Sequence, residues 1–490
     1  MKAKLLRDFF SRNYYENTWL LFSLYAFVQT AICSAGFHHP DEHFQILEPL
    51  GWKLGLYGPG DLAWEFKEQI RPGMQILLGW IIAKGMIGAD IYEPFLLTAF
   101  LRQVSGLLTW VVMVAYYQKW KLQFDNSTHR RVLLLFTCFL WFLPYLGVRY
   151  SSENWGALLF FSGLYCVLFN HPVNRNYWLF TAGLLMGLSF YIRFQMAFAI
   201  VGFLAWSLYS KKHTITEYGV LLFGGLTGAV AGTLADYWLY NQWVFTPYNY
   251  FFQNIIAGKA ASFGTHPAWF YVTAFLGHAV PPISILLLVL LIAGIWKNLR
   301  SPYAAVFICF FLAHSAVGHK EMRFMFPMAL LLPLLCRYGW RALEQKFTSN
   351  YLLFKYLFRM TLGINISLLV LVAVKPAHGR EALYKAFYMI HNDNPEQKIV
   401  YATKSPFDDG LKINFFNYCK TCFTPVDSSK KEDNYYLYTI RLSDLSKFGN
   451  VDARLEYSTA PIVPEPFNIG HWQERTNRVF IWRVTRDLRD

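Results

Sequence analysis

The chain has 490 residues, of which 55% are hydrophobic and only 16% are charged, and its formal net charge is +14. Soluble globular proteins carry about 25% charged residues, so this composition disfavours a soluble protein. It predicts a polytopic membrane protein, whose apolar segments must cross roughly 30 Å of hydrocarbon. The Lys and Arg residues fall between apolar runs, which is typical of cytoplasmic loops and disfavours nucleic-acid binding.

Apolar runs predict about eleven membrane crossings in an α-helical module that covers residues 1–375. The predicted spans are 17–36, 95–117, 132–148, 155–170, 177–191, 194–209, 217–239, 269–295, 303–317, 324–338 and 352–374. The run at 74–89 is interpreted as a juxtamembrane or re-entrant helix, because the basic N-terminus and the basic loops can then all be cytoplasmic. Those loops are 118–131, 209–217, 296–300 and 336–347.

The composition changes near residue 376, and residues 376–490 are predicted to form a small soluble α/β domain on the outer face. "KIVYAT" and "RVFIWRV" are typical of short strands, and "PFDDG", "VDSSKKEDN" and "VPEPFNIG" of turns. Cys419 and Cys422 form a C-K-T-C motif that fits half a zinc site, a local disulfide or two free thiols.

The predicted topology places the segments richest in polar residues on the outer face. They are 37–73, "VRYSSENW" (148–155), "YIRFQ" (191–195), "DYWLYNQWVFTPYNYFFQN" (236–254) and "GHKEMRF" (318–324). We therefore expect the chemistry of this protein on the side of the membrane opposite the cytoplasm.

The first outer segment, "GFHHPDEHFQ", places Asp41 and Glu42 among three histidines directly after an apolar run. Adjacent acids can belong to a solvated loop. The amphipathic continuation "QILEPLGWKLG" can instead lie in the membrane interface and hold the acids at a fixed depth. A carboxylate held there can accept a proton from a hydroxyl or bind a cation. His39, Asp41 and His43 alternate and so offer a transition-metal alternative, although Pro40 breaks regular structure and no fourth ligand is evident.

Further charged residues lie at the predicted outer ends of spans. Several Arg residues at one face indicate an anionic ligand, for which a lipid phosphate is the obvious candidate. Charges at span ends can also snorkel to the interface, and an ion pair between Glu65 and Arg71 can be a simple loop contact. The candidates are Glu65, Arg71, Arg149, Arg193, Asp236, His319, Lys320, Glu321 and Arg323.

Four ordered segments carry a resemblance to a known family. "HHPDEHFQILEP", "WEF" followed by "RP", "DYWLYNQWVFTPYNYF" and "HKEMRFMFP" together resemble the family 22 glycosyltransferases of the GT-C superfamily, in particular the mannosyltransferases that add the third mannose in GPI-anchor assembly, and their bacterial homologues. The likeness spans nearly the whole chain. The first and last motifs are specific, whereas an isolated Asp-Glu pair would be a weak signal.

The resemblance implies an integral membrane enzyme that moves mannose, with inversion, from a polyprenyl-phosphate carrier to a glycolipid acceptor. It implies that Asp41 is the catalytic base and that Glu42 orients the acceptor or the loop. A phosphate leaving group needs nearby cations, and the candidates, in order of preference, are Arg323, Lys320, Arg149 and Arg193. His38, His39, His43, Glu65, Arg71, His319, Glu321 and Asp236 are expected to bind substrate.

The family generally needs no metal or other cofactor, so the expected partners are the bilayer, the lipid-linked sugar donor and the acceptor. We expect the active site at the periplasmic face of a bacterial inner membrane or the lumenal face of the endoplasmic reticulum. The "RFQ" at 193–195 and "RYSSEN" at 149–154 match the family pattern only loosely. Transfer of a different sugar remains open, as does a lipid-linked sugar transporter or flippase, which would predict charges buried mid-span and two related halves.

Overall fold

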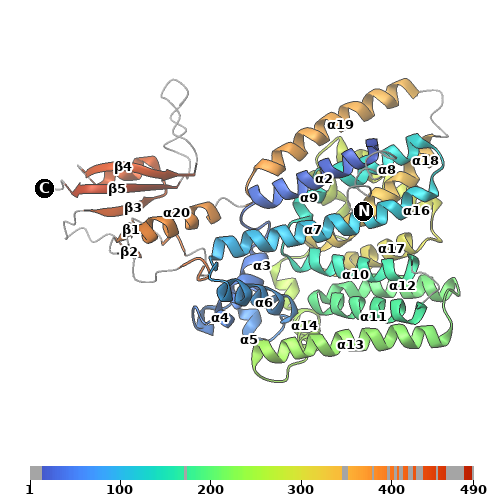
Figure 1. Cartoon of the computed structure of the whole chain (residues 1–490), viewed down its shortest axis with the longest axis horizontal. Coiled ribbons are helices and arrows are strands. Elements are labelled where there is room, and N and C mark those ends of the chain that lie inside the picture. The colour runs from blue at the N-terminus through green and yellow to red at the C-terminus, as the bar shows by residue number, and fades with distance from the viewer. Residues whose placement is uncertain are drawn as a thin grey trace, which may run out of the picture. The chain divides into compact units, whose positions relative to one another are not determined.

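A computed structural model describes most of the chain. The described residues are 14–169, 174–344, 351–377, 380–393, 395, 398–401, 405–407, 412–417, 423–425, 434–448, 451–459 and 479–487. The chain divides into two compact units (Figure 1). The first unit comprises Met1–Ser34, Trp64–Gly88 and Thr98–Lys375; the second comprises Ala35–Ala63, Ala89–Leu97 and Pro376–Asp490. Residues 35–63 and 89–97, expected within the first module, thus group with the C-terminal segment.

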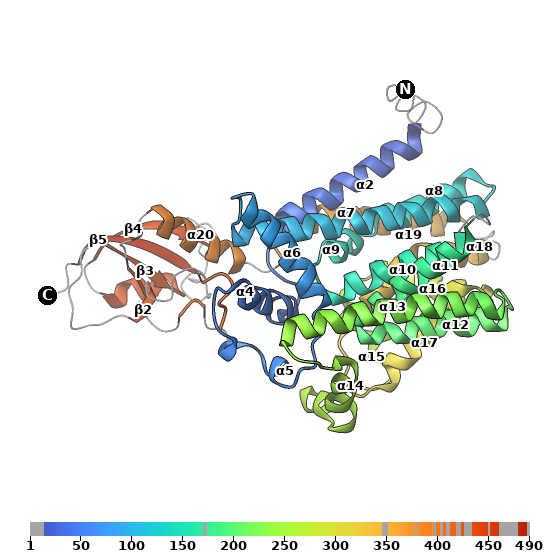
Figure 2. The same ribbon diagram turned by 60° about the horizontal axis from the view of Figure 1, so that its bottom comes forward.

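The first unit is helical. Its helices are α2 (Tyr14–Cys33), α5 (Trp64–Lys67), α6 (Met74–Gly88), α7 (Pro94–Trp120), α8 (Ser127–Phe139), α9 (Phe142–Gly147), α10 (Ser152–Phe169), α11 (Arg175–Ile192), α12 (Ala197–Tyr209), α13 (Ile215–Tyr240), α14 (Thr246–Phe251), α15 (Phe270–His278), α16 (Ile283–Lys297), α17 (Pro302–Ala316), α18 (Leu332–Glu344) and α19 (Tyr351–Val374), with 3-10 segments η3 (Lys121–Gln123), η4 (Phe194–Met196), η6 (Lys259–Phe263) and η7 (Met322–Leu331) and a π-helical segment η5 (Phe252–Ile256). The long helices run side by side in Figures 1 and 2.

Three described helices are long and apolar enough to cross a membrane: α7 with its 3-10 extension, α13 and the Tyr356–Val374 part of α19. A fourth candidate is the pair α16 and α17, which is bent by 119° at a short break. Helices α6 and Phe194–Tyr209 are apolar but shorter. The predicted helical segments are therefore present, whereas eleven crossings are not confirmed and stay a prediction.

Glycines set the closest helix contacts. A Cβ added at Gly183 of α11 would lie 2.0 Å from the Leu221 carbonyl oxygen of α13, and one at Gly187 would lie 2.3 Å from the Gly225 carbonyl oxygen. Gly339 of α18 is equally close to α16, at 1.9 Å from the Leu290 carbonyl oxygen. These helix pairs approach at the backbone itself, which is how small residues let helices pack closely in membranes.

Two predicted spans are interrupted. The segment 132–148 breaks between α8 and α9, where the Asn365 amide donates to the Phe139 carbonyl and accepts from the Trp141 backbone N–H at 3.2 Å. The segment 269–295 breaks between α15 and α16 at Pro281 and Pro282. Proline lacks a backbone N–H donor, so it begins a helix more readily than it continues one.

The second unit combines short helices with a sheet. It contains α3 (Pro40–Glu42), the π-helical segment η1 (His43–Leu47), α4 (Glu48–Leu54), the 3-10 segments η2 (Pro59–Asp61) and η9 (Leu442–Phe448), and α20 (Arg380–Asp393). The strands are β1 (Ile399–Tyr401), β2 (Phe423–Pro425), β3 (Tyr435–Thr439), β4 (Val451–Ser458) and β5 (Phe480–Asp487), in the order β2-β1-β3-β5-β4.

The first three strands of this sheet are parallel and the last two pairings are antiparallel. Helix α20 packs on the sheet through Phe387, whose ring lies 5.8 Å from that of Tyr438. "KIVYAT" and "RVFIWRV" do contain strands, as predicted. Cys419 and Cys422 lie outside the described residues.

Candidate functional site

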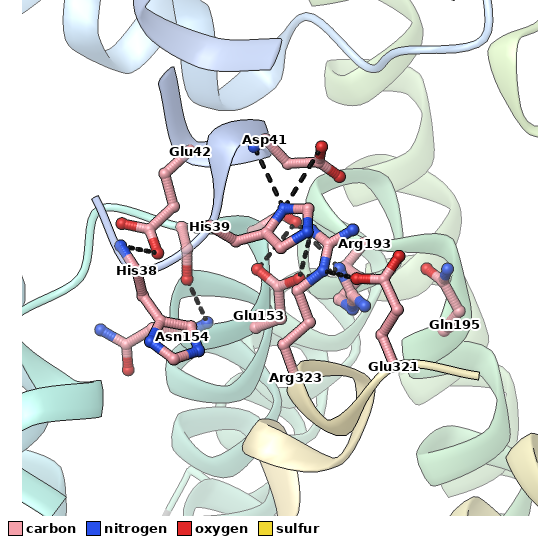
Figure 3. A network of polar contacts seen from close by, with 12 residues as sticks. His38, His39, Asp41, Glu42, Glu153, Asn154, Arg193, Gln195, Glu321 and Arg323 are labelled. Carbon is pink, nitrogen blue, oxygen red and sulfur yellow. Dashed lines mark hydrogen bonds and ion pairs between the residues drawn. The ribbon is translucent and has the colours of Figure 1, made fainter. Parts of the chain in front are cut away.

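The Asp41 segment, in the second unit, begins with a tight helix start. Pro40 occupies the first helical position and the His39 ring accepts a hydrogen bond from the Asp41 backbone N–H at 3.2 Å. The Asp41 carboxylate lies 3.4 Å from His39 Nδ1 and keeps 27% of its side chain exposed. Figure 3 shows Asp41 beside this ring. The carboxylate is thus held beside a histidine and remains partly exposed.

Glu42 is tied to its own loop. Its Oε1 accepts the His38 backbone N–H at 3.2 Å, as Figure 3 shows, while His38 itself is exposed. This contact closes the turn that carries Asp41. The orienting role that the resemblance implies for Glu42 stays a prediction.

His43 is buried and bonded to protein. Only 1% of it is exposed, and its Nε2 lies 2.7 Å from Glu48 Oε1. The same Glu48 oxygen accepts the backbone N–H groups of Asn414 at 2.9 Å and Phe415 at 3.1 Å. This placement favours a structural role for His43, in place of the substrate contact expected from the sequence.

Glu48 also has a second neighbour, because its carbonyl accepts the Tyr57 hydroxyl at 2.7 Å. Burial, reinforced by the Glu48 carboxylate, raises the pKa of Tyr57 well above its ordinary value, so the phenol stays a neutral donor. Glu48 therefore binds the segment after Asp41 to residues 414–415 of the same unit. Sequence reasoning missed this residue, although its position in an amphipathic helix was a signal.

The sequence offers His39, Asp41 and His43 as alternative metal ligands. Across the described residues no group of three or more His, Cys, Asp and Glu side chains is arranged to hold a metal ion. The bond from His43 to Glu48 accounts for why these three side chains do not converge.

Arginine and glutamate side chains of the first unit form a network of ion pairs and hydrogen bonds (Figure 3). Arg193 Nη1 donates to Glu153 Oε1 at 2.9 Å and to the Ser152 hydroxyl at 3.0 Å. Arg323 Nη1 approaches the same Glu153 oxygen at 3.4 Å, and its Nε bonds Glu321. The two arginines are thus held in place by two carboxylates, those of Glu153 and Glu321.

Backbone geometry positions each member of this network. Helix α11 ends at Ile192, and the next residue, Arg193, has an extended backbone, so the chain turns out of the helix at this residue. Glu153 lies in the first turn of α10, while Glu321 precedes η7, which carries Arg323. His319 joins through Nε2, 3.0 Å from Glu321 Oε1, and its Nδ1 lies 3.0 Å from the Gly264 carbonyl. Three segments distant in sequence thus meet here.

Arg193 retains unused donors. It is only 7% exposed, and its Nε and Nη2 have no hydrogen-bond partner among the residues that the structure describes. A buried N–H group without a partner costs free energy, and it costs more on a charged group. The arrangement therefore favours an anion at this point of the first unit.

The other predicted phosphate ligands are engaged by protein atoms. Lys320 is 3% exposed and donates to the carbonyls of His266, at 2.8 Å, and Val317. Arg149 is 2% exposed and donates to the Ser34 carbonyl at 2.6 Å. Both placements favour a structural role in place of the phosphate contact expected from the sequence.

Two further predicted substrate ligands also bind protein. Asp236 is fully buried; it accepts the Gly73 backbone N–H at 2.7 Å and the Thr246 hydroxyl. It therefore fastens the end of α13 to the segments before α6 and at α14. Glu65 and Arg71 pair with each other at 2.6 Å, both partly exposed.

A model of the Alg9-like mannosyltransferase family matches residues 18–417. The chain belongs to this family. The resemblance to family 22 glycosyltransferases drawn from the motifs is thereby confirmed.

Relatives of this mannosyltransferase family member include three named enzymes. Mannosyltransferase APTG1 of Arabidopsis thaliana is 25% identical over 67% of this chain and 60% of its own length. GPI mannosyltransferase 3 of Candida albicans is 24% identical over 67% and 64%, and GPI alpha-1,2-mannosyltransferase 3 of Bos taurus is 24% identical over 65% and 59%. The match thus spans about three fifths of the length of these relatives.

Among solved structures, ArnT from Cupriavidus metallidurans bound to undecaprenyl phosphate superposes with a TM-score of 0.56 at 10% identity, covering 96% of this chain and 98% of ArnT. At this identity the likeness shows the fold alone. The family member therefore has a GT-C-type fold with a small sheet in its second unit, as the sequence predicted.

Proposed function

We propose that this family member transfers mannose from a polyprenyl-phosphate carrier to a glycolipid or lipid-linked glycan, with inversion at the sugar, on the lumenal or periplasmic face of the membrane. The observation that carries the proposal is the Arg193 side chain, buried and bonded to Glu153, with Nε and Nη2 unpaired among the described residues. A phosphodiester offers the acceptor oxygens that these donors lack.

The reaction then runs in one displacement. The acceptor hydroxyl oxygen attacks C1 of the mannose, the bond between C1 and the phosphate oxygen breaks, and the hydroxyl proton passes to the Asp41 carboxylate. The leaving polyprenyl phosphate gains a negative charge as that bond breaks. Arg193 and Arg323 stabilise this charge, because preorganised donors favour the state in which charge develops.

Glu153 and Glu321 keep the two arginines in position. A buried guanidinium without a partner carries a large desolvation cost, which a shared carboxylate offsets. Two arginines and two carboxylates leave the network neutral in the absence of donor. The Nε and Nη2 atoms of Arg193, unpaired among the described residues, then remain for a phosphate.

Transfer by the purified full-length chain tests the proposal. Defined polyprenyl-phospho-sugars are incubated with a small panel of glycolipid acceptors, and NMR reads the product linkage. We expect mannose transfer with an α-linked product. Transfer of another sugar only, or movement of the lipid across the bilayer without a glycosidic product, would contradict it.

A further inference from the structure

The segment after α13 has an unusual arrangement of side chains. α14 and η5 together cover 246–256 and begin six residues after Tyr240, the last residue of a candidate membrane span. Figure 2 shows α14 beside one end of α13. The segment therefore lies near the level at which that span leaves the membrane.

One face of this segment is apolar and turned away from the protein. Its members recur at the spacing of a single helix face and are between 42% and 62% exposed: Tyr248, Phe251, Phe252, Ile255 and Ile256. Nearby Trp243 and Phe245 are 71% and 61% exposed. A surface helix of a soluble protein normally packs its apolar face against the core, whereas this helix exposes its apolar face.

The opposite face is polar and turned inward. Asn249 donates to the Gln69 carbonyl at 3.3 Å, and the Tyr250 hydroxyl accepts from Gln195 at 2.5 Å. Gln253 Nε2 donates to Glu68 Oε2 at 2.7 Å. These contacts fix the rotation of the helix, so the outward turn of the apolar face is set by hydrogen bonds of the inner face.

The sequence around this segment is nearly free of charged residues. Between residues 237 and 269 the sequence has no Asp or Glu, and Lys259 is its only Lys or Arg. Lys259 Nζ lies over the Trp64 ring, 4.9 Å from its centroid. Aromatic side chains with few acids are typical of the interface between headgroups and acyl chains.

We propose that residues 243–256 form a membrane-surface anchor, whose aromatic face inserts into the outer leaflet of the bilayer at the end of α13. The occupant of the exposed face is lipid. Interfacial helices bury their apolar face roughly 5–10 Å into the boundary between headgroups and acyl chains, which sets the expected depth. The inference does not depend on the proposed transfer activity.

Site-specific fluorescence in lipid tests the anchor. An environment-sensitive fluorescent amino acid replaces Ile256 in the full-length chain, which is reconstituted into phosphatidylcholine vesicles that carry spin-labelled lipids at graded depths. The matched control carries the same residue in place of Asp125, an exposed polar loop position. We expect strong quenching at 256 by shallow spin labels, roughly 5–10 Å deep, and little at 125.

Two outcomes of this comparison would overturn the anchor. One is equal, weak quenching at both positions, which means that the face is in water. The other is a shielded probe that no spin-labelled lipid quenches, which means that protein covers the face. A variant with Phe252→Asp and Ile255→Asp should lose the quenching at 256 while it still elutes as a monodisperse protein; unchanged quenching there would also contradict the proposal.

Discussion

Arg193→Lys isolates the contribution of the unused guanidinium donors. Lysine keeps the positive charge, and so the attraction to Glu153, but it lacks the planar fork that Nε and Nη2 provide. Hydrogen bonds to charged groups contribute about 1.5–3 kcal/mol each. Loss of one such bond to the donor phosphate should raise the apparent KM for the lipid-linked sugar roughly 10- to 150-fold, at 1.4 kcal/mol for each factor of ten.

The assay is a titration of polyprenyl-phospho-mannose at saturating acceptor in reconstituted vesicles. Arg175→Lys is the matched control, because Arg175 pairs with Glu217 and is 38% exposed, so its KM should stay near the wild-type value. Equal elution profiles establish that all three proteins fold. A wild-type KM for donor in folded Arg193→Lys would refute the phosphate role of this side chain.

Four other outcomes follow from the structure. Arg323→Ala should weaken donor use with little change toward acceptor, and Arg323→Lys should restore only part of it, measured by the same titration. Asp236→Ala leaves the Gly73 N–H and Thr246 hydroxyl without an acceptor and should lower the free energy of unfolding by about 1–3 kcal/mol; an unchanged melting curve would contradict it. Gly339→Val should also lower the free energy of unfolding by about 1–3 kcal/mol, because its Cβ meets a backbone oxygen. Gly85→Val is the control and should lower it less, because its Cβ meets nothing within 4 Å. Asn126, in the predicted cytoplasmic loop, should carry no glycan after expression in a eukaryotic cell, and a glycan detected by mass spectrometry would overturn the predicted topology.

Local patterns predicted the helical segments well, since long apolar runs produce helices. The breaks inside 132–148 and 269–295 were not predicted. The second had a visible signal in Pro281 and Pro282, whereas the first depends on Asn365, more than 200 residues away. In the second unit, β2, β3 and β4 were not predicted, although the residues of β4 alternate in burial.

The sequence likewise predicted the candidate site only in part. Sequence placed Asp41 and Arg323 among functional residues, but it could not tell a substrate ligand from a side chain that bonds distant backbone. Lys320 and Asp236 belong to the latter kind, because their partners lie in other segments. The shared role of Glu153 between Arg193 and Arg323 likewise depends on the meeting of three separate segments.

Turnover of Asp41→Asn tests the central claim most directly. Asparagine keeps the size and shape of the side chain but cannot accept the hydroxyl proton. A positioned base contributes about 10²–10⁴-fold, so transfer should fall at least about a hundredfold in a protein that still folds and binds donor. Glu42→Gln, which can still accept the His38 N–H, should lose less activity. Near-normal turnover of Asp41→Asn together with an inactive Glu42→Gln would contradict the assignment of Asp41 as the base.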